Sequence, residues 1–192
     1  MPMIRKIVFC LSLCFVIAGF NSCTSSKLNK VYVTNTKKVP LLAPSSMNGS
    51  VECYEYFSGS FGEQSFAVTC YLTSDNEGMN ILMLNDFGVQ MGMIYYDGEA
   101  AGIESSILPD NFKSEYILLD IQNAYYDAEE LKNHYKQYKL DFTKEVLSDG
   151  TEVRKVFSKK DLIEEIRIFE KNIFIKNYLR GYSYELTGAD DE

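Results

Sequence analysis

Residues 80–98, NILMLNDFGVQMGMIYYDG, contain the pattern that decides the fold class of this chain. Two apolar runs, 80–84 and 89–96, flank a polar turn over 85–88, and Asp97-Gly98 follows as a second turn signal. Short apolar runs separated by Asn, Asp and Gly are typical of antiparallel hairpins. Both runs are apolar on both faces, which predicts strands that are buried on two sides or line an apolar interior.

The last third of the chain repeats this alternation of strand and turn. Ile166 and Ile168 alternate with Glu165 and Arg167, as expected for a sheet with one buried face. Asp149-Gly150 is a hairpin turn signal. The strands predicted here are Lys139–Leu147, Glu152–Ser158, Leu162–Phe169, Ile173–Tyr178 and Tyr182–Leu186.

Between these two groups of strands lies a segment with helical spacing. Pro109 opens it, and apolar and amide side chains then predict a helix that ends near Tyr125. Asp127 predicts the N-cap of a second helix with a capping box, and Leu131 and Tyr135 give that helix an apolar side. The residues with helical spacing in the first helix are Phe112, Tyr116, Leu119 and Asn123.

Before residue 80, stretches 52–57 and 66–72 alternate in polarity and predict a hairpin around a turn over 58–63. The predicted fold class is therefore mainly β (α+β), with about 9–11 antiparallel strands and two central helices. A sheet of this many meandering strands curls or closes on itself, and we therefore expect a strongly curved sheet or an incomplete antiparallel barrel.

Two cysteines lie in this first hairpin. If its turn is centred between residues 60 and 62, the numbers of opposed residues sum to 123, and Cys53 faces Cys70. The two thiols are then a candidate disulfide, in a compartment that permits one. The alternative is a pair of small apolar residues on one sheet face, because only a non-hydrogen-bonded pair suits the bond.

The first 22 residues have the parts of a bacterial signal peptide. Arg5 and Lys6 are followed by an apolar run over 7–20, and its 14 residues are fewer than the ~20 that a membrane-spanning helix needs. Phe20-Asn21-Ser22 before Cys23 resembles a lipobox, so we predict cleavage before Cys23 and acylation of its sulfur and amine. An ordinary signal peptide with a coincidental cysteine is the alternative.

The remaining chain divides into three parts. Residues 23–50 are predicted to be an acylated N-terminus and tether, residues 51–187 the folded domain, and residues 188–192 an acidic tail. Thr24 follows the anchor at the position where aspartate favours retention in the inner membrane. We therefore expect an outer-membrane lipoprotein that faces the periplasm and reaches the membrane through acylated Cys23.

Charge and residue content exclude several function classes. Without Arg5 and Lys6, 17 basic residues stand against 27 acidic ones, a net charge of −10, so nucleic acid is not an expected partner. The chain has no cysteine and histidine cluster with metal-ligand spacing and no glycine-rich phosphate loop, so no metal or cofactor is predicted.

The sequence contains little that indicates catalysis, and we predict that the protein is not an enzyme. His134 is the only histidine and lies on a charged helix, which favours a surface role. The adjacent acids Glu129 and Glu130, and likewise Glu164 and Glu165, point apart on a helix or a strand, so neither pair has the geometry of paired-carboxylate hydrolysis.

Asp120 and Gln122 are polar residues within an apolar stretch, 116–122. Buried polar groups need hydrogen-bond partners, so both are predicted to tie the helix to a strand or loop backbone as a structural polar pair. A ligand-contacting role is the alternative. The 14 Tyr and 12 Phe residues fit either a packed core or a cavity for an elongated apolar ligand.

Short motifs in a fixed order carry a family resemblance over residues 51–187. They are Leu84–Gly88, Ile94–Asp97, Leu108-Pro109, Tyr116–Gln122, Asp149-Gly150, Asn177 and Gly181-Tyr182. In these the chain resembles a bacterial lipoprotein family found with aryl-polyene and flexirubin pigment gene clusters. That family is distantly similar to the outer-membrane lipoprotein receptor LolB. The sequence departs from the family at Asn123 and at 125–127, where the family often has Leu and Trp-Pro.

The resemblance implies a LolA/LolB-like incomplete barrel around helices, with an apolar cavity that binds acyl chains. It implies transfer of a lipid-like cargo, such as an acyl chain, a polyene lipid or a lipoprotein, and a periplasmic LolA-like carrier as partner. The alternative is a structural or adaptor lipoprotein with a filled core that binds a protein partner. The size of the interior cavity distinguishes the two.

Overall fold

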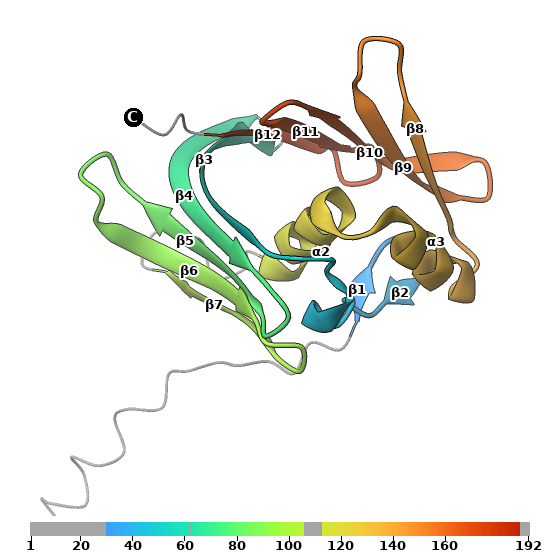
Figure 1. Ribbon diagram of the computed structural model, residues 1–192, viewed down its shortest axis with the longest axis horizontal. Helices are drawn as coiled ribbons and strands as arrows, with labels where there is room; N and C mark the ends of the chain where they lie inside the picture. The colour runs from blue at the N-terminus through green and yellow to red at the C-terminus, as the bar shows by residue number, and fades with distance from the viewer. Residues whose placement is uncertain (1–29, 62, 106–112, 189–192) are drawn as a thin grey trace, which may run out of the picture.

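The computed structural model of this chain describes residues 30–61, 63–105 and 113–188. Ten antiparallel strands form one strongly curved sheet, and two helices lie on its concave side (Figure 1). Within the described residues the sheet is open, because its end strands each pair on one side only. The predicted fold class, a curved sheet with two central helices, is confirmed.

The large sheet consists of two meanders joined at their first and last strands. Its strand order is β7-β6-β5-β4-β3-β12-β11-β10-β9-β8, so β3 pairs with β12 at the centre. The strands are β3 (Val51–Phe61), β4 (Gln64–Ser74), β5 (Met79–Leu84), β6 (Gln90–Tyr96), β7 (Ala101–Ser105), β8 (Asp141–Val146), β9 (Glu152–Ser158), β10 (Asp161–Phe169), β11 (Asn172–Asn177) and β12 (Tyr182–Gly188).

The close contact between β3 and β12 explains why residue 59 is a glycine. This residue pairs with Tyr184, and a Cβ added to Gly59 would lie 2.4 Å from the Tyr184 Cβ. A glycine is therefore needed here by packing between strands rather than by a turn. Strand β3 continues through residues 58–61, which the sequence pattern assigned to the turn.

This longer strand changes the register of the first hairpin. Phe61 pairs with Gln64, so opposed residue numbers sum to 125 rather than 123. Cys53 consequently faces Leu72, Cys70 faces Glu55, and both thiols are free. The predicted direct opposition of the two cysteines is wrong, and with it the candidate disulfide.

The helices lie close to where the sequence places them. Helix α2 (Ser114–Tyr125) ends at the predicted residue, and α3 (Ala128–Gln137) follows. The Asp127 side chain accepts hydrogen bonds from the backbone N–H groups of Glu129 and Glu130, which satisfies two N-terminal donors of α3. Pro109 and Phe112, expected at the start of the first helix, lie outside the described residues.

The segment before β3 is folded rather than a free tether. Strands β1 (Val31–Tyr32) and β2 (Lys38–Val39) pair with each other, and a 3-10 turn, η2, follows at Pro44–Ser46. Val31 and Val39 are 1% and 0% exposed. The predicted tether over residues 23–50 is therefore wrong from residue 31 onward, because short apolar stretches here complete the core.

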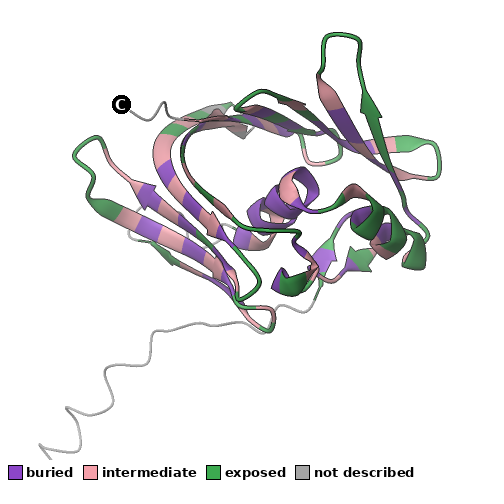
Figure 2. Ribbon diagram, in the orientation of Figure 1, coloured by how far each residue is buried: buried purple, intermediate pink, exposed green. Residues whose placement is uncertain are grey.

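Buried residues follow the concave side of the sheet and the face of α2 that it surrounds (Figure 2). Within the described ranges, no helix has the length and apolar character needed to cross a membrane. The predicted signal peptide and Cys23 lie outside those ranges, as do residues 189–192 of the predicted tail over 188–192, while Gly188 ends β12.

Candidate functional site

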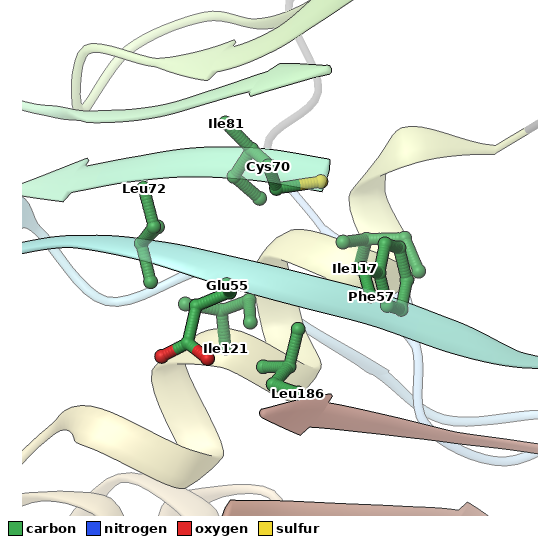
Figure 3. A pocket seen from close by; sticks show the side chains of 8 residues that line it. All are labelled: Glu55, Phe57, Cys70, Leu72, Ile81, Ile117, Ile121 and Leu186. Atoms are coloured by element: carbon green, nitrogen blue, oxygen red, sulfur yellow. The ribbon is translucent and has the colours of Figure 1, made fainter. Parts of the chain in front are cut away.

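A small apolar cavity lies between helix α2 and the centre of the concave sheet (Figure 3). Its volume is about 10 Å³, which is room for about one water molecule. Side chains therefore fill most of the interior around it. The residues that line it are Glu55, Phe57, Cys70, Leu72, Ile81, Ile117, Ile121 and Leu186.

The position of this cavity follows from how the curved sheet holds α2. The helix packs against β6 and β7 on one side and against β10 on the other, with β1 also in contact. Ile117 and Ile121, one helical turn apart, face the middle of the sheet, where β3, β4, β5 and β12 supply the remaining wall. The cavity thus lies where the helix spans the concavity.

Among the described residues that line the cavity, Glu55 is the only charged one. It comes from β3 and is only 4% exposed. Its Oε1 atom accepts hydrogen bonds from the Tyr125 hydroxyl at 3.1 Å and from the Cys53 thiol at 3.4 Å. Its Oε2 atom is buried and has no hydrogen-bond partner among the described residues. Burial raises the pKa of Glu55 even though these two donors and the positive charge of Lys171 lower it.

The two cysteines lie next to this carboxyl group. Burial, followed by the negative charge of Glu55, raises the pKa of both Cys53 and Cys70 to about 12. Thiols with such values are poor nucleophiles at neutral pH because the reactive thiolate is rare. Both cysteines therefore act as small apolar parts of the interior.

A second buried carboxyl group, Asp120, lies on a different side of α2. Its Oδ2 atom accepts hydrogen bonds from the hydroxyls of Tyr182 at 2.7 Å and Tyr184 at 2.9 Å, both on β12. Its other oxygen, Oδ1, has no N–H or hydroxyl donor among the described residues, but the Asp120 carboxyl hydrogen-bonds the Glu164 carboxyl.

Asp120 and Glu164 share a proton, because two carboxyl groups hydrogen-bond only when one of them is protonated. Burial and then the charge of Glu164 raise the pKa of Asp120 well above its ordinary value. Burial also raises the pKa of Glu164 to about 7. We call these two carboxyls and their hydrogen-bonded neighbours the carboxyl cluster.

Asn123 connects the carboxyl cluster to helix α3. Its Nδ2 atom donates to Glu164 Oε1 at 3.1 Å, and its Oδ1 atom accepts from the Tyr135 hydroxyl at 2.9 Å. The Arg154 guanidinium donates to the backbone carbonyls of Asn123 and Tyr126, which holds the end of α2 in place. The carboxyl cluster consists of Asp120, Asn123, Tyr135, Glu164, Tyr182 and Tyr184.

The other polar residues predicted from the sequence have structural contacts. Gln122 bonds both backbone groups of Leu42, donating to the carbonyl and accepting from the N–H, each at 2.9 Å. The Nε2 atom of His134 is 2.8 Å from the Pro40 carbonyl oxygen and donates a hydrogen bond to it when this nitrogen carries the proton. Burial lowers the pKa of His134. Asp120 bonds strand side chains instead of the backbone that the sequence predicted.

A larger hollow of about 400 Å³ opens at the surface near the β1–β2 turn. It is wide, and its described wall mixes hydroxyl, amide and apolar groups with the exposed carboxylate of Asp161. Its lining residues are Thr34, Asn35, Thr36, Ser158, Asp161, Leu162, Ile163, Tyr178 and Leu179.

Sequence reasoning missed Glu55 as an interior residue. The stretch 52–57 was interpreted as charged residues alternating with apolar ones, but Glu52 and Glu55 are three positions apart and must point to opposite faces of a strand. That odd spacing is the signal that one of the two acids lies inside. Figure 3 shows Glu55 on β3, with its carboxyl beside Ile121 of α2.

Comparison with known proteins gives a family but no activity. The model of a family described as "Protein of unknown function (DUF3261)" matches residues 56–189, more than two-thirds of the 192 residues. The match begins one residue after Glu55 and includes the carboxyl cluster. A search of curated proteins finds no match.

Proposed function

The chain belongs to the DUF3261 family, whose description names no function, and from its geometry we propose that it is an envelope lipoprotein that binds a lipid-like cargo. The apolar chain of the cargo binds between α2 and the concave face of the sheet. Acylated Cys23 holds the protein at the outer membrane, on the periplasmic side. The cavity between α2 and the sheet centre is the observation that carries this proposal.

Cargo has to enlarge this cavity, because about 10 Å³ does not accommodate an acyl chain. The inner face of β5 favours such repacking. Met79 and Met83 are buried on either side of Ile81, which lines the cavity. Methionine side chains are flexible and adapt to irregular apolar shapes, so this wall can repack around an added chain.

The short connection to Cys23 supports access to a membrane. Since residues from 31 onward are folded, six residues, 24–29, separate Cys23 from Lys30. Fully extended, this connection reaches about 25 Å. A domain on such a short connection stays close to the bilayer, where lipid-like cargo is found.

A second candidate function is that of an adaptor with a filled core. The small cavity favours it, and so does an apolar row on the outer face of the sheet. Tyr54 and Tyr71 oppose each other there with ring centroids 4.7 Å apart, and the row continues through Leu82 and Met93. Tyr54 is 51% exposed, which makes it available to a protein partner.

Binding of a fluorescent fatty acid distinguishes the two functions. We expect the Cys23→Ser chain, which carries no acyl group, to shift the emission of the probe saturably. Cys70→Phe fills the cavity and should weaken binding more than about tenfold. Thr69→Phe, on the opposite face of the same strand, is the matched control and should leave binding unchanged. If the unaltered pocket gives no saturable binding, the adaptor function is favoured and lipid binding is rejected.

A further inference from the structure

We propose that Glu55 selects cargo whose apolar chain carries a hydroxyl group. This inference rests on the proposed function and names the class of cargo. The carboxyl of Glu55 lies in the wall of the cavity, among side chains that are otherwise apolar. A hydroxyl on the cargo donates a hydrogen bond to Oε2 of this carboxyl.

The hydrogen bonds of Glu55 are unequally distributed between its two oxygens. Oε1 has two donors, the Tyr125 hydroxyl and the Cys53 thiol, whereas Oε2 has none among the described residues. An ionised carboxyl accepts up to about four hydrogen bonds, and leaving a buried oxygen unpaired destabilises the fold. Such a group is expected where a ligand completes the set of donors.

The chemistry of the pocket favours a hydroxyl over other polar groups. Ether, ester and ketone oxygens accept hydrogen bonds but donate none. A phosphate or carboxylate placed next to Glu55 is repelled by the negative charge, so the headgroup of a fatty acid has to lie away from this residue. An ammonium group has three donors, whereas the described residues that line the cavity beside Glu55 are apolar and the Tyr125 hydroxyl is the one nearby acceptor that the hydrogen bonds of Glu55 show. A hydroxyl has a single donor, which matches the single unpaired oxygen.

The position of Glu55 places this contact along an apolar chain. Phe57 follows it on the same face of β3, and Leu186 and Ile121 lie near it from β12 and α2 (Figure 3). A chain that lies along α2 between Ile117 and Ile121 passes the carboxyl while the rest of its surface contacts apolar residues. Apolar contact provides affinity, and the hydrogen bond provides selectivity.

Two isomeric probes isolate the hydroxyl group. 1-Decanol and 1-methoxynonane have the same formula, but only the alcohol donates a hydrogen bond. Each probe is titrated into the Cys23→Ser chain with bound fluorescent fatty acid at pH 8, and its affinity is measured from the displacement of the fatty acid. We expect the alcohol to bind about tenfold more tightly, the contribution of one hydrogen bond to a charged group.

Variants at Glu55 assign the preference to its carboxyl. In Glu55→Leu both probes should bind equally well, because the acceptor is gone and the pocket stays apolar. In Glu55→Gln the amide N–H donates to the ether oxygen, so the preference should fall at least about threefold with folding retained. Glu185→Leu, an exposed acid on β12, is the matched control and should keep the tenfold preference.

The outcomes separate this inference from the proposed function. If neither probe displaces the fatty acid and the fatty acid itself does not bind, the proposed function fails, and selection by Glu55 fails with it. If both probes bind equally to the chain with Glu55 intact, cargo binding stands and the inference about Glu55 is overturned. Retention of the tenfold preference in Glu55→Leu also overturns it.

Discussion

Two buried carboxyl sites lie on the concave face of one sheet, against the same helix, and differ in how fully they are hydrogen-bonded. In the carboxyl cluster, Asp120 has two tyrosine hydroxyls and a shared proton, and Glu164 has the amide of Asn123. Glu55 has both of its donors on one oxygen and none on the other. Each site has one buried oxygen without an N–H or hydroxyl donor, but Asp120 also interacts with a second carboxyl group, that of Glu164, whereas Glu55 has no such neighbour among the residues that line its cavity.

Helix α2 separates the two sites by its own geometry. Ile117 and Ile121 form an apolar stripe toward the cavity, whereas Asp120 and Asn123 form a polar stripe toward β10 and β12. Since successive residues are 100° apart, the two stripes lie on neighbouring sides of the helix. A buried acid whose neighbours are all polar groups of the fold holds the helix in place, whereas a buried acid with an unpaired oxygen beside a cavity is available to a ligand.

Asn123→Leu should have the largest effect, because it breaks the carboxyl cluster. The change removes the donor to Glu164 and the acceptor for the Tyr135 hydroxyl while keeping a similar side-chain volume. We expect a loss of about 3–5 kcal/mol in the free energy of unfolding, as found when a buried charged group loses its partner. Urea denaturation measures it, and a loss below about 1 kcal/mol would contradict the structural role of the cluster.

The shared proton predicts how stability depends on pH. The pKa values of Asp120 and Glu164 are raised in the folded state, Glu164 to about 7, so the folded protein binds more protons than the unfolded chain above about pH 4.5. Their contribution to stability is therefore greatest at acid pH and declines as pH rises toward 7. Each proton contributes up to about 1.4 kcal/mol per pH unit.

Asp120→Asn tests this proton balance. The amide keeps a donor toward Glu164 but does not titrate, so the decline in stability between pH 5 and 7 should fall to about half. Urea midpoints at several pH values provide the measurement. His134, whose pKa is lowered by burial, acts in the opposite direction but equally in both proteins. An unchanged slope would show that Asp120 binds no additional proton in the folded state.

Glu55→Leu should have a smaller effect on stability than either change in the cluster. It removes a buried carboxyl with one unpaired oxygen, which is favourable, and leaves the Tyr125 hydroxyl without its partner, which is unfavourable. We expect the two effects to offset each other within about 1 kcal/mol in urea denaturation. A loss as large as that of Asn123→Leu would mean that both sites are structural.

The thiols beside Glu55 provide the smallest test. Because the pKa values of Cys53 and Cys70 are about 12, each thiol is ionised in roughly one protein molecule in 10⁴ at pH 8. Iodoacetamide should therefore label both slowly in the folded protein and rapidly in urea, with labelled peptides identified by mass spectrometry. Rapid labelling of either cysteine in the folded state, or a Cys53–Cys70 peptide pair, would contradict this description of the pocket.

The strands were predictable where apolar and polar residues alternate and turns carry Asp-Gly or Asn-Asp. The register of the first hairpin was not predictable, because glycine is common in turns and Gly59 therefore resembles a turn residue. Only its contact with Tyr184 of β12, more than 120 residues away in sequence, explains its place within a strand. Long-range packing of this kind leaves no local signal.

The candidate site was predictable in part for similar reasons. Asp120 was identified because it lies in an apolar stretch, but its tyrosine partners on β12 have an ordinary strand pattern. Glu164 lies two residues before Ile166, so the alternation that buries this isoleucine also places Glu164 on the inner face, whereas its hydrogen bond to Asn123 of α2 leaves no local signal. Glu55 was detectable from its odd spacing to Glu52.

The pairing of β3 with β12 has a consequence for how the molecule is assembled. Partners across this junction are at least 121 residues apart, whereas the other neighbouring strands of the sheet follow each other directly in the chain. Contacts of such high sequence separation form late and slow the folding of β proteins. Leu186 of the cavity and the two tyrosines that donate to Asp120, Tyr182 and Tyr184, lie on β12. Both sites therefore form only when β12 is in place, so a chain that has not been synthesised through residue 188 has neither.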